Sequence, residues 1–473
     1  MTTPAPARRS LTAIVLAAGK GTRMRSDLPK VLHRLAGRSM LGHVLAAVQA
    51  AGAARIAVVA EPGRDDVARE IAALAPGAAI YPQVERLGTA HAVLAARAIL
   101  SQGDDGEGDD GEGDDGEGDD VIVAFGDTPL ITGETLSRLR APLAEGAAVV
   151  VLAFETEAPA GYGRVLTEGA RVVAIREEKD ASEAERAVRL CNAGLMALSG
   201  DHALALLERI GNDNAAGEYY LPDAVALAVG DGLSVAVVPV TEAEAQGVND
   251  RVQLGVAEAA IQARLRRSAQ LGGATLVAPE TVFLSHDTIL GRDVLVEPNV
   301  VFDTGVRVDD GCVVHAFSHL KDVRLEAGAS VGPFARLRGG AVLEAGASIG
   351  NFVELKNARL GPGAKAAHLT YLGDAEVGAR ANVGAGTITC NYDGVSKHRT
   401  TIGAGAFIGS NSALVAPVAI GEGAFVASGS VITDDVPDGA LAVARGRQAT
   451  KPGWAEWKRA ALQAEKVARA GKP

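Results

Sequence analysis

Leu-Glu-Ala-Gly-Ala-Ser occurs at residues 325–330 and again at residues 343–348, and this hexapeptide decides the fold of the C-terminal half. Aliphatic residues recur at every sixth position around it, at Leu325, Val331, Leu337, Leu343, Ile349 and Leu355. Two further series keep this step, namely Val294, Val300, Val306 and Cys312, and Ile402, Ile408, Leu414, Ile420, Val426 and Ile432. A six-residue period fits neither an α-helix nor a hairpin, whereas three hexapeptides make one coil of a parallel β-helix. We therefore expect a left-handed parallel β-helix of hexapeptide repeats with these residues pointing inward.

Other features of this half fit the same architecture. The chain contains 57 glycines, and the tight corners of a β-helix account for the excess. The six-residue step fails between Val383 and Ile402, where residues 387–394 are polar and aromatic. We expect the solenoid to eject this segment as a loop on its binding side. Past Pro437 the repeat stops, and residues 454–470 predict a terminal helix that caps the solenoid.

The N-terminal half has a different pattern. Short apolar runs alternate with Ala-rich helical stretches, at residues 12–17, 55–60, 121–124, 148–154 and 234–240. This alternation predicts a Rossmann-like α/β domain around a mixed, mostly parallel sheet. In residues 251–270, helical spacing relates Val252, Val256, Ala260 and Leu265, and Gly272-Gly273 follows. We therefore predict an α/β domain over residues 1–250, a linker helix over 251–271 and the β-helix domain over 272–473.

The net charge of −12 is concentrated in one acidic insert. Residues 103–120 repeat Gly-Asp-Asp-Gly-Glu and contain eight Asp, three Glu and no basic residue, so the rest of the chain has a net charge of −1. A nearly neutral protein is a poor candidate for nonspecific nucleic-acid binding. The insert cannot bury apolar surface and repels itself, so we expect a disordered, solvated spacer. Metal buffering or partner binding is the alternative.

The cysteine count and the N-terminal sequence indicate the cellular compartment. The three cysteines, Cys191, Cys312 and Cys390, are scattered and not at metal-ligand spacing. This pattern argues against a disulfide framework and fits a reducing cytoplasm. The apolar run at residues 13–18 is too short for a signal core or a membrane span. We expect a cytoplasmic protein without a membrane or nucleic-acid partner.

A glycine-containing loop follows the first predicted strand. It reads Leu16-Ala17-Ala18-Gly19-Lys20-Gly21-Thr22-Arg23-Met24, with Pro29-Lys30 after it. Two glycines let backbone N–H groups close around phosphates, and Arg23 and Lys30 supply positive charge. The loop is neither a Walker A motif nor a dinucleotide fingerprint. Asp127 ends another apolar strand, where its carboxylate suits a magnesium ion, although a turn or cap residue is the plainer alternative.

The string Leu-x-x-Gly-x-Gly-Thr-Arg-Met followed by Pro-Lys resembles the signature of sugar-1-phosphate nucleotidyltransferases. Further motifs of this pattern are Gln83 with Gly88-Thr89, Gly161-Tyr162-Gly163-Arg164, Glu177-x-Lys179-Asp180, Asn192-Ala193-Gly194 and Gly247-Val248-Asn249. Outside the insert, essentially the whole chain resembles the bifunctional N-acetylglucosamine-1-phosphate uridyltransferase/glucosamine-1-phosphate acetyltransferase family. The resemblance implies acetyl transfer from acetyl-CoA to glucosamine-1-phosphate, and then uridyl transfer from UTP to N-acetylglucosamine-1-phosphate. The product, UDP-N-acetylglucosamine, would be a precursor for peptidoglycan and lipopolysaccharide.

The same resemblance implies roles in the N-terminal half. UTP or the UDP-sugar would be held by Leu16, Ala17, Ala18, Gly19, Lys30, Gln83, Gly88, Thr89 and Gly126. Arg23 and Lys30 would act in catalysis by steadying the triphosphate. Asp127 and Asn249 would bind the cofactor Mg²⁺, and Gly163, Glu177 and Asn192 would hold the acetylated sugar. The family often has Tyr where Phe125 stands, which is expected to alter one nucleotide contact.

In the C-terminal half, Arg338 and Lys356 lie 18 residues apart, which is one coil, so they are expected to stack on one face as a phosphate site. Residues 366–374 interrupt the aliphatic spacing with His368 and Tyr371. A lone histidine is more often structural, but the surrounding polar residues favour a functional one. The resemblance implies that Arg338, Lys356, Tyr371 and Asn382 bind glucosamine-1-phosphate, with His368 as the catalytic base. It also implies an acetyl-CoA site made by Ala385, Asn391, Tyr392, Ser410, Ser428 and Arg445.

One further departure and two alternatives accompany this interpretation. Ser428 stands where the family usually has Ala, which matters little for a backbone contact. The resemblance further implies a homotrimer with acetyl-transfer sites between subunits. The first alternative is a nucleotidyltransferase whose β-helix only regulates or oligomerises, but a passive solenoid has no need of His368 and Asn391. The second is a nonenzymatic scaffold, against which the presence of Asp127, Lys30 and Arg23 argues.

Overall fold

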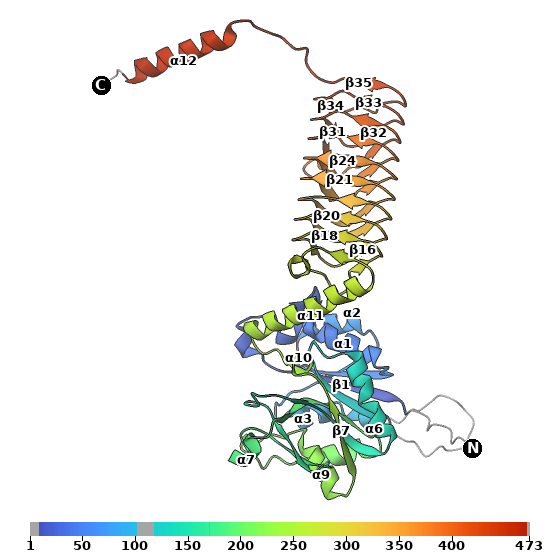
Figure 1. The fold of residues 1–473 in the computed structure, drawn as a ribbon, viewed down its shortest axis with the longest axis vertical. Helices are drawn as coiled ribbons and strands as arrows, with labels where there is room; N and C mark the ends of the chain where they lie inside the picture. Colours follow the sequence, from blue (N-terminus) through green and yellow to red (C-terminus); the bar gives the residue numbers. More distant parts are fainter. Residues whose placement is uncertain (1–8, 102–117, 170, 471–473) are drawn as a thin grey trace, which may run out of the picture. The chain divides into compact units, whose positions relative to one another are not determined.

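The computed structural model describes residues 9–101, 118–169 and 171–470, and it divides into two compact units. The first unit runs to residue 268 and includes residues 283–286, and the second contains residues 269–282 and those from 287 onward. Figure 1 shows helices around a sheet in the first unit and stacked coils in the second. Residues 103–117, most of the predicted disordered insert, lie outside the described residues.

A mixed, mostly parallel sheet forms the centre of the first unit, as the strand and helix alternation predicts. Its strand order is β11-β7-β10-β6-β1-β4-β5, with β10 antiparallel to both neighbours and β8 paired with β10 and β9. The strands are β1 (Leu11–Leu16), β4 (Arg55–Ala60), β5 (Ala79–Pro82), β6 (Asp120–Phe125), β7 (Ala147–Glu155), β8 (Arg164–Glu168), β9 (Arg171–Arg176), β10 (Leu190–Leu198) and β11 (Ser234–Pro239). A separate pair joins β2 (Arg34–Leu35) and β3 (Arg38–Ser39). The central strands are continuous apolar runs because helices cover both faces.

Each face of the sheet has its own hydrophobic core. Alternate residues of β1 point to opposite faces, so Ala13 and Val15 belong to one core and Ile14 to the other. The first core is covered by α1 (Met40–Ala50), α2 (Asp65–Leu74), α5 (Gly133–Arg138) and α6 (Arg140–Ala144). The second is covered by α3 (Thr89–Ala95), α4 (Arg97–Ser101), α8 (Ala203–Glu208) and α9 (Asp223–Gly230). Shorter helices are η1 (Thr22–Met24), η2 (Lys30–Leu32), α7 (Glu183–Arg186) and α10 (Glu242–Ala245).

The end of the acidic insert belongs to the fold, which corrects its predicted boundary at residue 120. Strand β6 begins at Asp120, and the preceding Asp119 is buried. The Asp119 carboxylate accepts a hydrogen bond from Thr12 Oγ1 at 2.8 Å and pairs with Arg55 Nη2 at 2.7 Å. Composition could not separate these aspartates from the repeat, because only their tertiary partners distinguish them.

The predicted helix after residue 250 is α11 (Arg251–Leu271), and two residues of its expected apolar series, Ala260 and Leu265, are partly buried against a core. Val252 and Val256 are exposed, whereas Ala257 and Ile261 pack into a small core with Met40. Buried Gln262 donates through Nε2 to the Leu284 carbonyl and accepts the Leu284 N–H at Oε1. Most of this helix therefore belongs to the first unit.

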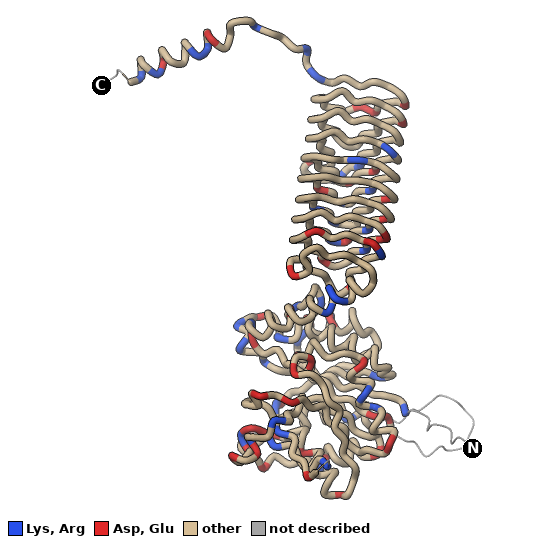
Figure 2. The backbone as a smooth tube through the Cα atoms, viewed as in Figure 1, with Lys and Arg blue, Asp and Glu red and all other residues tan. Residues whose placement is uncertain are grey.

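The second unit is a parallel β-helix, as predicted. Residues of the aliphatic series are all buried, at 4% exposure or less. Strand register advances by 17 or 18 residues per coil through most of the solenoid, as in the pairing of Ser330 with Ser348. The coil after Asn382 is longer, because Asn382 pairs with Phe407. Lys, Arg, Asp and Glu are interspersed along the coils (Figure 2).

The coils stack their short strands into two long sheets. One contains β12 (Thr275–Leu276), β14 (Leu295–Val296), β17 (Val313–Val314), β19 (Ser330–Val331), β21 (Ser348–Asn351), β24 (Lys365–His368), β27 (Asn382–Val383), β30 (Phe407–Ile408), β33 (Phe425–Val426) and β35 (Leu441–Ala442). The other contains β13 (Ile289–Leu290), β15 (Val301–Phe302), β16 (Val306–Val308), β18 (His319–Leu325), β20 (Arg336–Leu343), β22 (Glu354–Lys356), β23 (Arg359–Leu360), β25 (Tyr371–Gly373), β26 (Ala375–Val377), β28 (Ile388–Cys390), β29 (Thr400–Ile402), β31 (Ala413–Val415), β32 (Val418–Ile420) and β34 (Val431–Ile432). The turn η3 (Pro279–Thr281) lies between β12 and β13.

The ejected loop begins later than predicted. Thr387 and Thr389 are buried, and the Thr389 hydroxyl donates to the Gly373 carbonyl and accepts from the Gly373 N–H. Because these bonds satisfy the hydroxyl, threonine replaces an aliphatic residue inside the coil. The loop consists of residues 391–399, in which Val395 is 90% exposed.

The C-terminal helix is present, but it does not cap the solenoid. Helix α12 (Trp454–Ala470) has no buried residue, and Trp454 and Trp457 are both exposed. Helical periodicity identified the element, whereas its packing partner depends on tertiary contacts. Within the described ranges, none of the helices combines the length and apolarity that a membrane crossing requires.

Truncating an inward aliphatic residue tests the β-helix core. Leu355 is fully buried and Leu369 is 62% exposed, so the same Leu→Ala change separates burial from residue chemistry. We expect Leu355→Ala to destabilise the β-helix by about 2–5 kcal/mol and Leu369→Ala to have a much smaller effect. Urea unfolding followed by circular dichroism measures both, and equal shifts would contradict the inward assignment.

Candidate active sites

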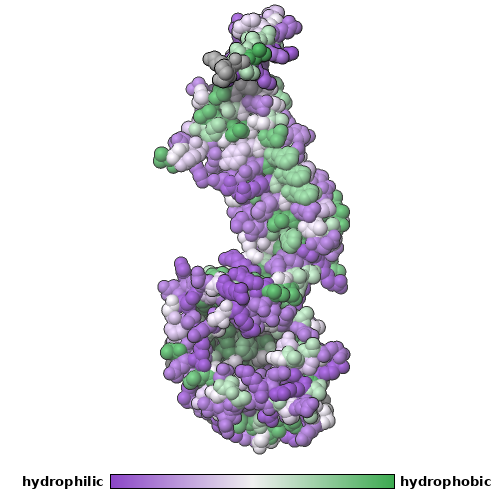
Figure 3. Space-filling model, turned by 90° about the vertical axis from the view of Figure 1, so that its left-hand side faces the viewer, coloured by the Kyte–Doolittle hydropathy of each residue, from purple (hydrophilic) through white to green (hydrophobic). Residues whose placement is uncertain are grey.

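The predicted nucleotide residues gather at one cavity, beside the C-terminal ends of β1 and β6. Its lining includes Leu16, Ala17, Ala18, Gly19, Lys30, Gln83, Gly88, Thr89, Phe125 and Asp127, together with Arg86 and Glu218. The amide groups of residues 18–21 make no hydrogen bond to any residue that the structure describes. They are therefore available to an anionic ligand. Figure 3 shows a hollow in the surface of this unit.

Gly126, which was predicted to hold the nucleotide, is not among the residues that line this cavity, and its contact is with the backbone of β1. Its N–H donates to the Leu16 carbonyl at 2.9 Å, which ties the end of β6 to the end of β1. Gly88 is required for a close approach, because its φ is +123° and a Cβ would lie 2.5 Å from the Tyr219 carbonyl oxygen. Thr89 accepts the Leu221 N–H at Oγ1, so these contacts fix residues 219–221 against the cavity wall.

A second cavity receives the residues predicted to hold the sugar. It is lined by Arg23, Gly161, Tyr162, Gly163, Glu177, Asn192, Ala193, Gly194, Gly247, Asn249 and Gln253, and it shares Phe125 and Asp127 with the first. The Asn192 N–H donates to the Gly163 carbonyl at 2.8 Å, which joins two of these segments. Burial raises the pKa of Glu177, and the neighbouring Asp223 adds to this effect.

Lys30 connects the two residues predicted to bind magnesium. Its ammonium pairs with Asp127 Oδ2 and donates to Asn249 Oδ1, the latter at 3.0 Å. A carboxylate and an amide oxygen thus converge on one cation. Among the described residues, no group of three or more His, Cys, Asp or Glu could hold a metal. The pair still fits Mg²⁺, which takes few protein oxygens and completes its shell with water and phosphate.

Sequence reasoning missed Gln253, which helps to position this pair. Gln253 accepts the Asn249 N–H at Oε1, at 2.7 Å, and the Val248 N–H donates to the Asp127 carbonyl at 2.8 Å. These bonds attach the first turn of α11 to the end of β6. The only available signal was the position of Gln253, one helical turn after Asn249.

In the β-helix, Arg338 and Lys356 are register partners, which confirms that they stack on one face. Arg338 is paired through Nη2 with Glu354 at 2.8 Å. Lys397, from the loop, lies beside Lys356 and lowers the pKa of that lysine, with a smaller contribution from Arg338. Lys397 was not predicted, because no repeat places the loop against the coils.

Tyr371 and Asn391 meet next to this cationic group. A Cβ at Gly373, the register partner of Lys356, would lie 2.4 Å from Tyr371 Oη and 2.8 Å from Asn391 Nδ2. Asn391 Nδ2 also donates to Asp374 Oδ2. Burial works to raise the pKa of Asp374, but hydrogen bonds from Asn357 and Asn391 and the nearby lysines outweigh it and lower the pKa. Asp374 therefore remains ionised and fixes Asn391.

His368 lies on β24, on the other sheet from Lys356 and Tyr371. Its Nδ1 is 2.6 Å from Asn351 Oδ1, which is an acceptor, so Nδ1 bears the proton and neutral His368 keeps a lone pair on Nε2. Asn351 is the register partner one coil earlier and was not predicted. Asn382 shares the sheet of His368, and within the described residues no hydrogen bond joins either to Lys356 or Tyr371.

The predicted acetyl-CoA residues lie on successive coils. The Asn411 N–H donates to the Ala385 carbonyl, and the Gly429 N–H donates to the Ser410 carbonyl. Arg445 Nη1 donates to the Ser428 carbonyl at 2.7 Å, so these contacts follow one edge of the solenoid. Asn391 is buried, whereas Tyr392 is exposed at the start of the loop.

The first unit is an α/β fold with a loop of free amides, and the second is a β-helix with a histidine and a cationic cluster. Together they define a nucleotidyltransferase joined to a hexapeptide transferase. Residues 13–209 match the MobA-like NTP transferase domain family, and residues 399–434 match the bacterial transferase hexapeptide repeats. Curated relatives named Bifunctional protein GlmU cover almost the whole chain. The protein from Xanthobacter autotrophicus is 63% identical over 96% of this chain and 98% of its own length, and that from Agrobacterium fabrum is 53% identical over 98% and 99%. The chain belongs to the GlmU family.

The pKa of Lys356 tests the position of the loop. Because a like charge disfavours protonation, replacing Lys397 by Met is expected to raise the pKa of Lys356 towards the ordinary lysine value. NMR titration of lysine Cε-labelled protein measures this value. Lys365→Met removes an equal charge from β24, on the other sheet, and should leave it unchanged. An unaltered Lys356 pKa in Lys397→Met would contradict the contact.

Proposed function

We propose that this chain synthesises UDP-N-acetylglucosamine, with acetyl transfer on the β-helix followed by uridyl transfer in the α/β unit. The observation that carries this proposal is the presence of two separate polar sites, one with free loop amides and Lys30, the other with His368 and a cationic cluster. Membership of a family of bifunctional proteins supports two activities in one chain.

For uridyl transfer, the sugar phosphate attacks the α-phosphorus of UTP in line and pyrophosphate leaves. Such a reaction needs positioning and charge neutralisation, and no protein nucleophile. The amides of residues 18–21 and the cations Arg23 and Lys30 bind the triphosphate, while Gly163, Glu177 and Asn192 orient the acetylated sugar. Bound at Asp127 and Asn249, Mg²⁺ would neutralise phosphate charge.

For acetyl transfer, the amine of glucosamine-1-phosphate attacks the thioester carbonyl of acetyl-CoA, and the coenzyme leaves as its thiolate. His368 Nε2 accepts the proton that the amine loses, because Asn351 holds the proton of the imidazole on Nδ1. Arg338, Lys356 and Lys397 neutralise the phosphate of the sugar. Ala385, Ser410, Ser428 and Arg445 offer an edge for the extended coenzyme.

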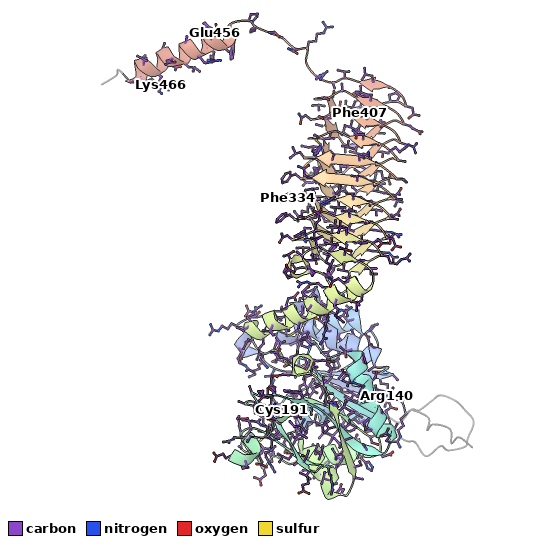
Figure 4. The ribbon with its side chains drawn as sticks, viewed as in Figure 1. Arg140, Cys191, Phe334, Phe407, Glu456 and Lys466 are labelled. Atoms are coloured by element: carbon purple, nitrogen blue, oxygen red, sulfur yellow. The ribbon has the colours of Figure 1, made fainter. Side chains whose placement is uncertain are left out.

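We further propose a cytoplasmic homotrimer. Three exposed phenylalanines, Phe317, Phe334 and Phe352, stack on successive coils with ring centroids 4.8 and 5.2 Å apart, and Figure 4 labels Phe334. Burying such a surface between copies is favourable. Because His368 and Lys356 lie on different sheets, a neighbouring subunit would complete each acetyl-transfer site.

The three cysteines are free, in keeping with a reducing compartment.

The base in acetyl transfer can be tested without disturbing the other reaction. We expect His368→Ala to lower acetyl transfer to glucosamine-1-phosphate by about 10²–10⁴-fold, because the amine loses its proton acceptor. Pyrophosphate release from UTP and N-acetylglucosamine-1-phosphate should be unchanged. His315→Ala is the matched control on the same β-helix, and it should retain both activities. Loss of both activities in a folded His368→Ala protein would sink the two-site assignment.

Asp127 supplies the converse test. Asp127→Asn is expected to reduce magnesium-dependent pyrophosphate release by about 100-fold or more, because it removes the only carboxylate proposed for the metal. Acetyl transfer should continue at the wild-type rate. Asp201→Asn, on an exposed residue paired with Arg9, serves as the control. Normal uridyl transfer by Asp127→Asn would exclude this residue as a ligand.

A further inference from the structure

Two arginines from outside the nucleotide loop hold its two ends. Arg86 donates through Nε to the Ala18 carbonyl at 2.9 Å, at the start of the loop. Arg251 donates through Nε to the Met24 carbonyl at 3.2 Å, at its end. Neither residue belongs to the motifs that mark the site, and the two come from segments far apart in the sequence.

Arg86 is itself fixed by an opposite charge. Its Nη2 lies 2.9 Å from Glu61 Oε1, and Glu61 directly follows β4. The guanidinium therefore connects the end of β4 to the loop that follows β1, while it also lines the nucleotide cavity. Because Glu61 balances its charge, Arg86 is better suited to holding the loop than to attracting a phosphate.

Arg251 is the first residue of α11, and it contacts the other end of the loop. Its Nη1 lies 3.4 Å from Nδ1 of the buried His33, just past η2. The imidazole can only accept from a guanidinium, so His33 orients Arg251 towards the Met24 carbonyl. Met24 is buried, which anchors this end of the loop.

The segment between the two arginines requires such support. The amides of residues 18–21 have no hydrogen-bond partner among the described residues, and the backbone bond that holds this segment is the one from the Met24 N–H to the Gly21 carbonyl at 2.9 Å. Gly21 has a φ of +58°, and a Cβ at this position would lie 2.5 Å from Lys30 Cβ. The close packing of Gly21 on Lys30 fixes the middle of the loop but not its ends.

We propose that Arg86 and Arg251 are positioning residues that hold the loop of residues 18–24 in its triphosphate-binding conformation. This inference rests on the proposed uridyl transfer and adds residues to that site. A loop whose ends are fixed before binding loses less conformational freedom when the nucleotide arrives, so UTP binds more tightly. The two arginines contribute to UTP affinity without taking part in the chemical step.

The test compares Arg86→Met and Arg251→Met with the full-length wild type. We expect KM for UTP to rise about tenfold in each, while kcat, KM for N-acetylglucosamine-1-phosphate and the acetyl-transfer rate change little. Amide hydrogen exchange of residues 18–25, measured by mass spectrometry without ligand, should become faster in both. Arg209→Met removes an exposed arginine paired with Asp231 and is the matched control.

Two further variants, Glu61→Gln and Arg86→Lys, distinguish whether Arg86 holds the loop or simply attracts the phosphates of UTP. If Arg86 holds the loop, Glu61→Gln should loosen the loop and weaken UTP binding, and Arg86→Lys should fail to restore either. Tighter UTP binding in Glu61→Gln, wild-type behaviour of Arg86→Lys, or unchanged loop exchange in Arg86→Met would overturn the proposal. If the wild type itself released no pyrophosphate from UTP, the uridyl-transfer assignment would fail instead, and loop exchange would still report on the two arginines.

Discussion

Parallel strand register determines which side chains meet in both halves of this chain. In the β-helix, a coil of 17 or 18 residues places Arg338 beside Lys356 and Asn351 beside His368, although neither pair is close in sequence. In the α/β unit, β1, β4 and β6 end at one edge of the sheet and deliver the phosphate loop and Asp127 to one cavity. Each site therefore depends on backbone pairing before any side-chain chemistry.

Polar residues concentrate where these regular patterns stop. Lys30 lies between Asp127 and Asn249, so the site in the first unit is preassembled around a positive charge. On the β-helix, the loop after Cys390 brings Lys397 to Lys356, which gathers several cations on one face of the coils. The like charges of Lys356 and Lys397 repel each other, and an anionic substrate bound beside them relieves this repulsion.

Sequence reasoning succeeded where periodicity and burial coincide. The six-residue aliphatic series was buried throughout, because an inward position in a coil accepts few polar groups. It was less accurate where a hydrogen bond substitutes for an aliphatic contact, as at Thr389, whose hydroxyl is satisfied by Gly373. For α11 it was right about Ala260 and Leu265 and wrong about the exposed Val252. It also missed Gln262, which is buried with both of its amide atoms bonded to Leu284.

The sequence by itself determined the two architectures, the loop with free amides and most residues of the candidate sites, because these depend on local periodicity and on motifs within short segments. Only the tertiary structure decided the contacts of Arg86 and Arg251 with the loop, of Asn351 with His368 and of Lys397 with Lys356. The physical reason is that a hydrogen bond or a charge contact between distant segments leaves no periodic trace in the chain. It exists only once the backbone has brought the two segments within reach.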